Sequence, residues 1–222
     1  MAQKIKILVV LGPTASGKSE LAVKLAKRFR GEVISADSRQ VYKGLDIGSG
    51  KVLRDKSTYY SLFSTYYHEG IRHHLLDVAS PKRTFTVAQY QRLAQKTLRD
   101  ILRRGKLPII CGGTGLYIDA LLYGWKFPEV RPNPKLRKQL EKLPADELFA
   151  ELRRIDPRRA ETIDRHNKRR LVRALEIILK SGRKIPSLIR TNGRITKYDI
   201  LKIGIRPPTV ELKSRIKERL LK

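Results

Sequence analysis

Eight residues near the N-terminus have the types and spacing of a phosphate-binding loop. They follow the pattern Gly-x-x-x-x-Gly-Lys-Ser and comprise Gly12, Pro13, Thr14, Ala15, Ser16, Gly17, Lys18 and Ser19. The glycines let successive backbone N–H groups point into one concavity, and a helix that begins here adds its positive dipole. Lys18 would bring a charge to the terminal phosphates, and the Ser19 hydroxyl would hold Mg²⁺. The loop predicts that a diphosphate or triphosphate binds here. By itself it suggests a nucleotide such as ATP.

The metal-binding aspartate of a typical ATPase has no strong counterpart. Such an enzyme carries an apolar strand that ends in Asp. The nearest candidate, Leu75-Leu76-Asp77, is short, and the strong apolar run at 107–111 ends in glycine instead. This weakens the ATPase interpretation but leaves it open.

Two further segments come directly after expected strands. The first, 35–42, contains Asp37, Ser38, Arg39 and Gln40; the second, 112–117, contains Thr114. Doubly wound sheets bind their ligands at the carboxyl ends of the strands, so both segments are candidate site residues. Taken separately, an Asp in this place is about as often a helix N-cap, and a glycine-rich turn is more often only a turn.

The hydrophobic pattern alternates between strands and helices over the first half of the chain. We expect strands at 5–11, 32–36 and 107–111. We expect helices from Gly17 to a stop at Gly31, from 87 to 104 with Thr86 as the N-cap, and from about 115 to 122. Leu21, Leu25 and Phe29 would lie on one face of the first helix. The order predicts an α/β fold, a P-loop NTPase-like three-layer sandwich with a parallel sheet.

After residue 123 the pattern becomes helical and charged. We expect helices at 135–142, 145–154 and 168–180, a returning strand at 198–205, and a last helix capped by Thr209. The predicted division is a core of 1–125 with 198–222 and a helical insertion at 126–197.

The charge of the chain is strongly positive. Its 49 Lys and Arg against 21 Asp and Glu leave a net charge of +28, and the excess leans towards the second half. Nucleic acid is the partner that this balance favours, while a merely solvated basic surface is the alternative.

The remaining composition argues for a cytoplasmic protein without membrane contact. Cys111 is the only cysteine, so no internal disulfide can form, and the apolar run before the P-loop is too short for a signal sequence or a membrane span. His73 and His74 are a poor metal chelate because adjacent strand residues point to opposite faces.

Taken together and in this order, several blocks resemble the tRNA dimethylallyltransferases, also called tRNA isopentenyltransferases. The similarity covers nearly the whole chain and includes residues 12–19, 35–42, 44–48, 73–78, 104–108, 112–117 and 170–176.

The resemblance implies transfer of a dimethylallyl group from dimethylallyl diphosphate to N6 of the adenine 3′-adjacent to the anticodon, within the anticodon stem-loop of tRNA. The P-loop and Mg²⁺ on Ser19 would hold the diphosphate, with Lys18, Asp37 and Thr114 as catalytic residues and Asp37 as the general base. The tRNA contacts that it implies are Asp37, Ser38, Arg39, Gln40, Thr114, Arg137, Arg169, Arg170 and Arg173.

Two departures from the family pattern stand out. Ser19 takes the place of a Thr, which preserves the hydroxyl, and the family pattern continues well beyond 215–219, whereas this sequence stops at Lys222. We therefore expect either a fragment or a shortened protein, acting as a monomer. The alternatives are a prenyl transferase for free adenine nucleotides, a small-molecule kinase, and an inactive RNA-binding remnant. Which tRNAs are used and the length of the prenyl chain do not follow from the sequence.

Overall fold

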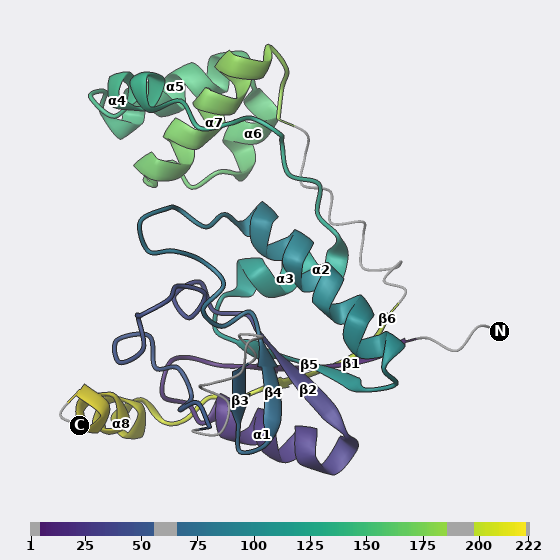
Figure 1. The fold of residues 1–222 in the computed structure, drawn as a ribbon. Coiled ribbons are helices and arrows are strands. Elements are labelled where there is room, and N and C mark those ends of the chain that lie inside the picture. The colour runs from purple at the N-terminus through teal and green to yellow at the C-terminus, as the bar shows by residue number, and fades with distance from the viewer. Residues whose placement is uncertain (1–4, 56–65, 186–197, 221–222) are drawn as a thin grey trace. The chain divides into compact units, whose positions relative to one another are not determined.

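The computed structural model describes residues 5–55, 66–185 and 198–220 (Figure 1). These residues fall into two compact units. Residues 5–124 and 198–220 form an α/β unit, and residues 125–185 form a helical unit. Each unit is described by itself.

A six-stranded sheet forms the centre of the α/β unit. Its order is β3-β4-β2-β5-β1-β6, and only the β3–β4 pair is antiparallel. The strands are β1 (Ile5–Leu11), β2 (Gly31–Ser35), β3 (Tyr66–His68), β4 (Ile71–His74), β5 (Leu107–Gly112) and β6 (Tyr198–Gly204). The parallel strands β2, β5 and β1 lie side by side, so their carboxyl ends meet at one edge. The predicted parallel sheet is confirmed. Strand β3 was not expected from the sequence, whereas β4 contains His73 and His74, which were expected to lie on a strand.

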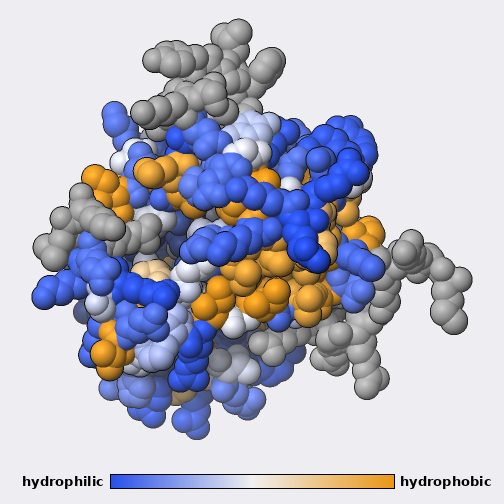
Figure 2. All heavy atoms as spheres, turned by 90° about the horizontal axis from the view of Figure 1, so that it is seen from below, coloured by the Kyte–Doolittle hydropathy of each residue, from blue (hydrophilic) through white to orange (hydrophobic). Residues whose placement is uncertain are grey.

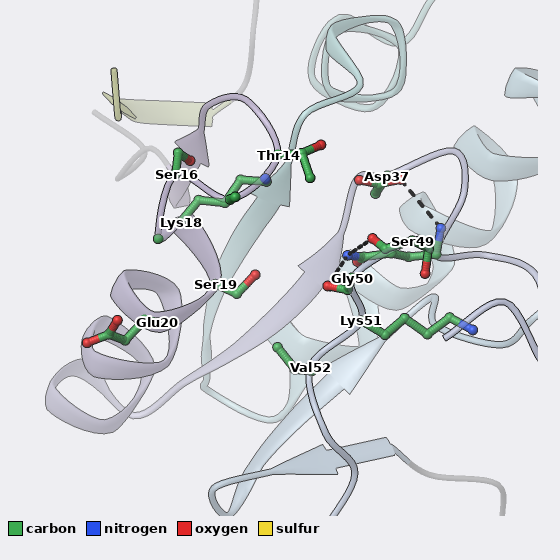
Figure 3. A pocket seen from close by; sticks show the side chains of 13 residues that line it. Thr14, Ser16, Lys18, Ser19, Glu20, Asp37, Ser49, Gly50, Lys51 and Val52 are labelled. Atoms are coloured by element: carbon green, nitrogen blue, oxygen red, sulfur yellow. Dashed lines mark hydrogen bonds between the residues drawn. The ribbon is translucent and has the colours of Figure 1, made fainter. Parts of the chain in front are cut away.

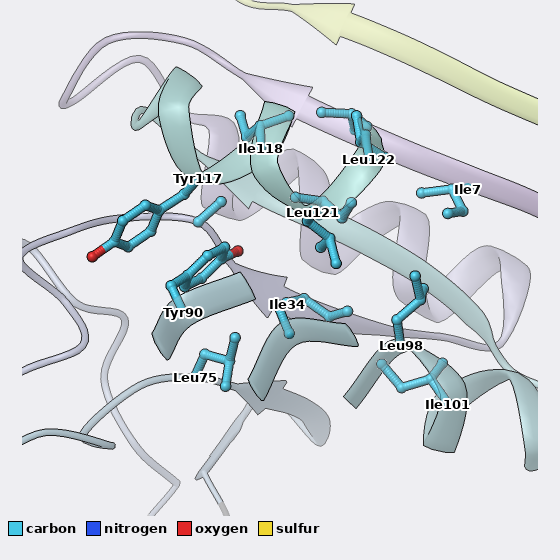
Figure 4. Packing of buried hydrophobic residues seen from close by; sticks show 14 of the residues in the cluster. Ile7, Ile34, Leu75, Tyr90, Leu98, Ile101, Tyr117, Ile118, Leu121 and Leu122 are labelled. Carbon is cyan, nitrogen blue, oxygen red and sulfur yellow. The ribbon is translucent and has the colours of Figure 1, made fainter. Parts of the chain in front are cut away.

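Helices cover both faces of this sheet. Helix α1 (Lys18–Phe29) lies on one face, and α2 (Val87–Arg103) and α3 (Gly115–Tyr123) lie on the other. Alternation along β1 explains the three layers, because Ile7 and Val9 join the core under α2 and α3 while Val10 joins the core under α1. Figure 4 shows the larger core, in which the rings of Tyr90 and Tyr117 stack with centroids 4.0 Å apart.

The first helix differs from its prediction. Its fully buried apolar side chains are Ala22, Val23 and Ala26; Leu21 and Leu25 are partly buried against the same core, and Phe29 is half exposed. Small residues let the helix approach the sheet closely, which the apolar spacing alone does not reveal. The helix also ends before Gly31: Arg30 takes a left-handed φ of 52°, and Gly31 is the first residue of β2.

The starts of two other helices were predicted to within one residue from capping residues in the sequence. Thr86 caps α2 as predicted, and the structure adds a capping box with Gln89. The last helix, α8 (Thr209–Leu220), begins at Thr209 instead of being capped by it, because the Leu212 N–H already bonds to the Pro208 carbonyl.

The helical unit contains α4 (Pro134–Leu140), α5 (Ala145–Ile155), α6 (Pro157–Thr162) and α7 (Lys168–Ser181). Its core includes four fully buried leucines, Leu148, Leu152, Leu171 and Leu175. Asn133, Asp156 and Asn167 cap the starts of α4, α6 and α7, and Gly182 ends α7 with a φ of 63°. Helix α6, which is only six residues long, was not expected from the sequence.

Hydrophilic side chains dominate the face of the molecule in Figure 2, where an apolar area interrupts them. Among the described residues, we find no helix with the length and apolar character needed to cross a membrane.

Candidate phosphate and nucleotide site

The P-loop connects β1 to α1 and leaves the start of that helix open. Gly17 precedes the helix with a φ of 84°, and no side chain caps the first turn. The first N–H groups of a helix lack partners within it, so they are available to an anion. Lys18 is mostly buried, and its Nζ donates to the Pro13 carbonyl at 2.9 Å. The loop is therefore a compact turn with a lysine folded back over it.

An open pocket of about 170 Å³ lies against this loop (Figure 3). The predicted residues Thr14–Ser19, Asp37 and Gln40 line it. Other lining residues were not predicted from the sequence: Glu20 and the segment 49–52, which contributes Ser49, Gly50, Lys51 and Val52. Only the glycines at 48 and 50, which suggest a turn, hinted at this segment.

Asp37 occupies the turn after β2 and is held by that turn. Its Oδ1 accepts the Arg39 N–H at 2.9 Å and the Gln40 N–H at 3.4 Å. These bonds orient the carboxylate on the side of the pocket that faces the P-loop (Figure 3). Asp37 can therefore stabilise the turn and also present its carboxylate to the pocket.

Thr114 joins the turn of Asp37 to the end of β5. Its Oγ1 accepts the Ser38 N–H at 3.0 Å, and its own N–H bonds to the Ala36 carbonyl at 3.1 Å. A side chain at Gly112 would place its Cβ 2.1 Å from the Ala36 oxygen, so only glycine fits. The glycine-rich segment therefore brings two strand ends into direct contact at the sheet edge.

Both the oxygen and the nitrogen of the Gln40 side-chain amide form hydrogen bonds within the protein. Its Oε1 accepts the Ser35 hydroxyl at 3.0 Å, and its Nε2 donates to the carbonyls of Ser49 and Gly50 at 3.3 and 3.2 Å. Gln40 thus shapes the pocket wall, a role that the sequence did not suggest. Arg39, in contrast, is exposed.

Arg137 and Arg173 meet at a buried carboxylate in the helical unit. Glu176 is fully buried and accepts bonds from Arg137 Nε at 2.9 Å, Arg173 Nη1 at 2.5 Å and the Asn133 N–H at 2.6 Å. Burial alone would raise the pKa of Glu176, but the bonds from Arg137, Asn133 and Arg173 lower it to about 2. The side chains of both arginines remain about a third exposed, and Arg169 and Arg170 are exposed at the start of α7.

The two adjacent histidines have separate environments. His74 Nε2 lies 2.7 Å from Glu32 Oε2, which Arg104 also binds. His73 is buried, and this burial lowers its pKa to about 4. Within the described ranges, no three His, Cys, Asp or Glu side chains are grouped to hold a metal ion. Asp77 pairs with Lys51.

The sheet order, the P-loop between β1 and α1, and the pocket at the carboxyl edge define a phosphate-binding protein with the P-loop NTPase-like fold. The IPP transferase family model matches residues 40–222, and the isopentenyl transferase model matches residues 5–60. The chain belongs to the IPP transferase family.

Curated proteins similar to this chain are named tRNA dimethylallyltransferases. A tRNA dimethylallyltransferase of Anoxybacillus flavithermus is 42% identical over 97% of this chain and 66% of its own length. One from Thermomicrobium roseum is 40% identical over 99% of this chain and 64% of its own. This chain thus spans about two thirds of the length of these relatives.

Solved structures of the family agree with the fold. The full-length tRNA isopentenylpyrophosphate transferase of Bacillus halodurans matches with a TM-score of 0.61 at 36% identity, over 98% of this chain and 65% of that one. A eukaryotic dimethylallyltransferase described as acting on tRNA matches with a TM-score of 0.73 at 31% identity, over 98% and 53% of the two chains.

Proposed function

We propose that this chain carries the donor site of an enzyme that transfers a dimethylallyl group from dimethylallyl diphosphate to tRNA. The acceptor is N6 of the adenine 3′-adjacent to the anticodon, and diphosphate is released. The observation that carries this proposal is that the P-loop and Asp37 line one pocket. The names of the relatives support tRNA as the acceptor molecule.

The P-loop would hold the diphosphate as a leaving group. When the allylic carbon–oxygen bond breaks, negative charge grows on the diphosphate, and donors already aimed at it stabilise the transition state. The open N–H groups of α1 and the Lys18 ammonium are such donors. Ser19 lines the same pocket and offers a hydroxyl.

The oxygen atoms around the P-loop suit Mg²⁺. This ion prefers oxygen ligands and is commonly bound by few protein groups together with substrate phosphates. Ser19 and Asp37 both present oxygen atoms to the pocket, and Ser16 Oγ is a buried oxygen for which no hydrogen-bond partner is found among the described residues. Mg²⁺ bound at Ser19 would add positive charge to the bound diphosphate.

Asp37 would act as the general base. As N6 of the adenine bonds to the allylic carbon, one N6 proton must leave, and the carboxylate can accept it. The two backbone N–H groups that bind Oδ1 fix the direction of that carboxylate. Thr114 holds the same turn through Ser38, which supports its inclusion among the site residues.

The acceptor must be a base drawn out of its stack, because the reacting amine cannot otherwise enter a pocket. A net charge of +28 favours tRNA as the partner. Arg39, Arg169 and Arg170 are exposed and available for phosphate contacts. Arg137 and Arg173 keep partial exposure beside Glu176. We place the protein in the cytoplasm as a monomer.

A transfer assay with labelled dimethylallyl diphosphate tests the proposal. The 222-residue chain is incubated with Mg²⁺ and either tRNA or AMP, and the label on each acceptor is counted. We expect label on tRNA, lost in Lys18→Ala and kept in Lys24→Ala, an exposed lysine of the same helix. Label on AMP alone would contradict the tRNA assignment. ATP consumption without any prenyl transfer would indicate a kinase, and salt-sensitive tRNA binding without transfer would indicate an inactive RNA-binding chain.

A further inference from the structure

Lys51 is a buried lysine at the edge of the phosphate pocket. Its side chain is 1% exposed. Lysine is almost never fully buried unless it is paired. Its Nζ donates to the Tyr42 carbonyl at 2.6 Å, to Asp46 Oδ1 at 2.6 Å and to Asp77 Oδ1 at 2.5 Å. An ammonium group has three protons, so three acceptors satisfy it completely.

The three acceptors come from different parts of the chain. Tyr42 follows the turn that carries Asp37, Asp46 belongs to the loop that leads to Lys51, and Asp77 lies between β4 and α2. Backbone bonds support the same junction, since the Asp77 N–H bonds to the Gln40 carbonyl at 3.3 Å and the Lys51 N–H bonds to the Asp46 carbonyl at 3.3 Å. Lys51 is therefore the polar centre at which these segments meet.

The neighbours of Lys51 in the chain form a wall of the pocket. Ser49, Gly50 and Val52 line the pocket together with the P-loop. Figure 3 shows the Lys51 side chain extending away from Ser19, so its ammonium does not reach towards the P-loop. Gln40 holds the same wall through the carbonyls of Ser49 and Gly50. The position of this wall thus depends on a side chain that faces away from the ligand.

We propose that Lys51 is a positioning residue of the donor site, whose buried ammonium fastens the pocket wall 49–52 to Tyr42 and Asp77. It sets the distance between this wall and the P-loop and so determines how tightly the pocket holds a diphosphate. The inference rests on the proposed function for the identity of the ligand. The anchoring itself rests on the contacts of Lys51.

The test compares Lys51→Met with Arg104→Met. Arg104 is the matched control, because it binds the mostly buried carboxylate of Glu32 in the same α/β unit but lines no part of the pocket. The dissociation constant of inorganic diphosphate is measured by calorimetry with Mg²⁺, and the melting temperature of each variant is recorded. We expect both variants to melt lower. Only Lys51→Met should bind diphosphate about 10-fold more weakly or worse, because a small displacement of a binding group is costly.

Asp77→Asn is a milder change at the same contact, and it keeps the proposal testable if Lys51→Met does not fold. It keeps an acceptor for Lys51 but removes one charge, so we expect a smaller loss of diphosphate affinity than for Lys51→Met. In the double variant, the two losses should not add, because both changes break the same contact. Additive losses, or equal diphosphate affinity in the parent, Lys51→Met and Arg104→Met, would overturn the proposal.

Hydrogen exchange separates this inference from the proposed function. In the ligand-free protein, amides 46–52 should exchange faster in Lys51→Met than in the parent, and Arg104→Met should leave them unchanged. Unchanged exchange in Lys51→Met would refute the anchoring role. If the parent itself binds no diphosphate while exchange changes as expected, the donor-site assignment fails and the anchoring role stands.

Discussion

The backbone N–H of Ser38 donates a hydrogen bond to Thr114 Oγ1 at 3.0 Å, although the two residues are 76 positions apart. This bond ties the turn that carries Asp37 to the end of β5. Because Asp37 takes its orientation from the same turn, the hydroxyl of Thr114 is coupled to the candidate base through the Ser38 backbone.

Replacing Thr114 with Val removes that hydroxyl at nearly constant volume. The Ser38 N–H then loses its acceptor, which should cost about 1 kcal/mol of stability. A shifted Asp37 should slow prenyl transfer about 10-fold or more. Thr114→Ser keeps the hydroxyl and serves as the control in urea unfolding and in the transfer assay. Equal transfer rates for the Val and Ser variants would disprove the coupling.

Asp37→Asn removes the candidate base while keeping its shape. Loss of a general base should lower the transfer rate by about 10²–10⁴-fold, with a much smaller change in tRNA affinity. Single-turnover transfer and filter binding measure the two effects. Asp199→Asn, at an exposed position of β6, is the control, and a full rate in Asp37→Asn would show that the base is another group.

Gly112→Ala should disrupt the junction between β2 and β5. The added Cβ would lie 2.1 Å from the Ala36 oxygen, and that oxygen belongs to the backbone, so it has little freedom to move. We expect a loss of about 3 kcal/mol or more in the free energy of unfolding. Gly48→Ala is the control, because none of the described residues has an atom within 4 Å of its added Cβ. Equal stability of the two variants would contradict this geometry.

The buried carboxylate of Glu176 should make the stability of the helical unit depend on pH. Its pKa is lowered to about 2 in the folded protein, against an ordinary value of about 4.3. The stabilisation is therefore complete above the ordinary value and is lost as the pH falls towards 2. Glu176→Gln should cost about 3 kcal/mol at pH 7.

The difference between Glu176→Gln and the parent should shrink when urea unfolding is repeated at lower pH. Glu151→Gln, whose carboxylate forms an i,i+3 pair with the exposed Arg154, should show little effect at any pH. A penalty for Glu176→Gln that stays constant down to pH 2 would contradict the lowered pKa.

His73 should remain neutral at acidic pH. Burial lowers its pKa to about 4, while an exposed histidine titrates near 6.5. As the pH falls from about 6.5 to 4, the unfolded chain binds a proton that the folded chain refuses, so stability decreases over this range. NMR titration of the His73 ring should give a midpoint near 4, and His73→Gln should flatten the pH dependence. A midpoint near 6.5 would show that the ring is accessible to water.

Features set by neighbouring residues followed from the sequence. The P-loop and the N-cap of α2 at Thr86 both depend on bonds between residues that are close in the chain. The nearly continuous apolar run at 5–11 likewise indicated that β1 is a strand with both faces covered. Such signals are readable because hydrogen bonding and side-chain direction repeat with the period of the element.

Contacts between distant segments were decided only by the tertiary structure. The residues next to Lys51 in the chain do not predict that its buried ammonium will bind Asp77. Likewise, Arg137 binds Glu176, which lies 39 positions away. The small-residue face of α1 and the short β3 and α6 also escaped prediction, because their stability comes from neighbours that the fold supplies. The sequence established which groups could bind phosphate and accept a proton. Packing of the strand ends determined that they line one pocket, because only the fold brings the ends of β1, β2 and β5 to one edge.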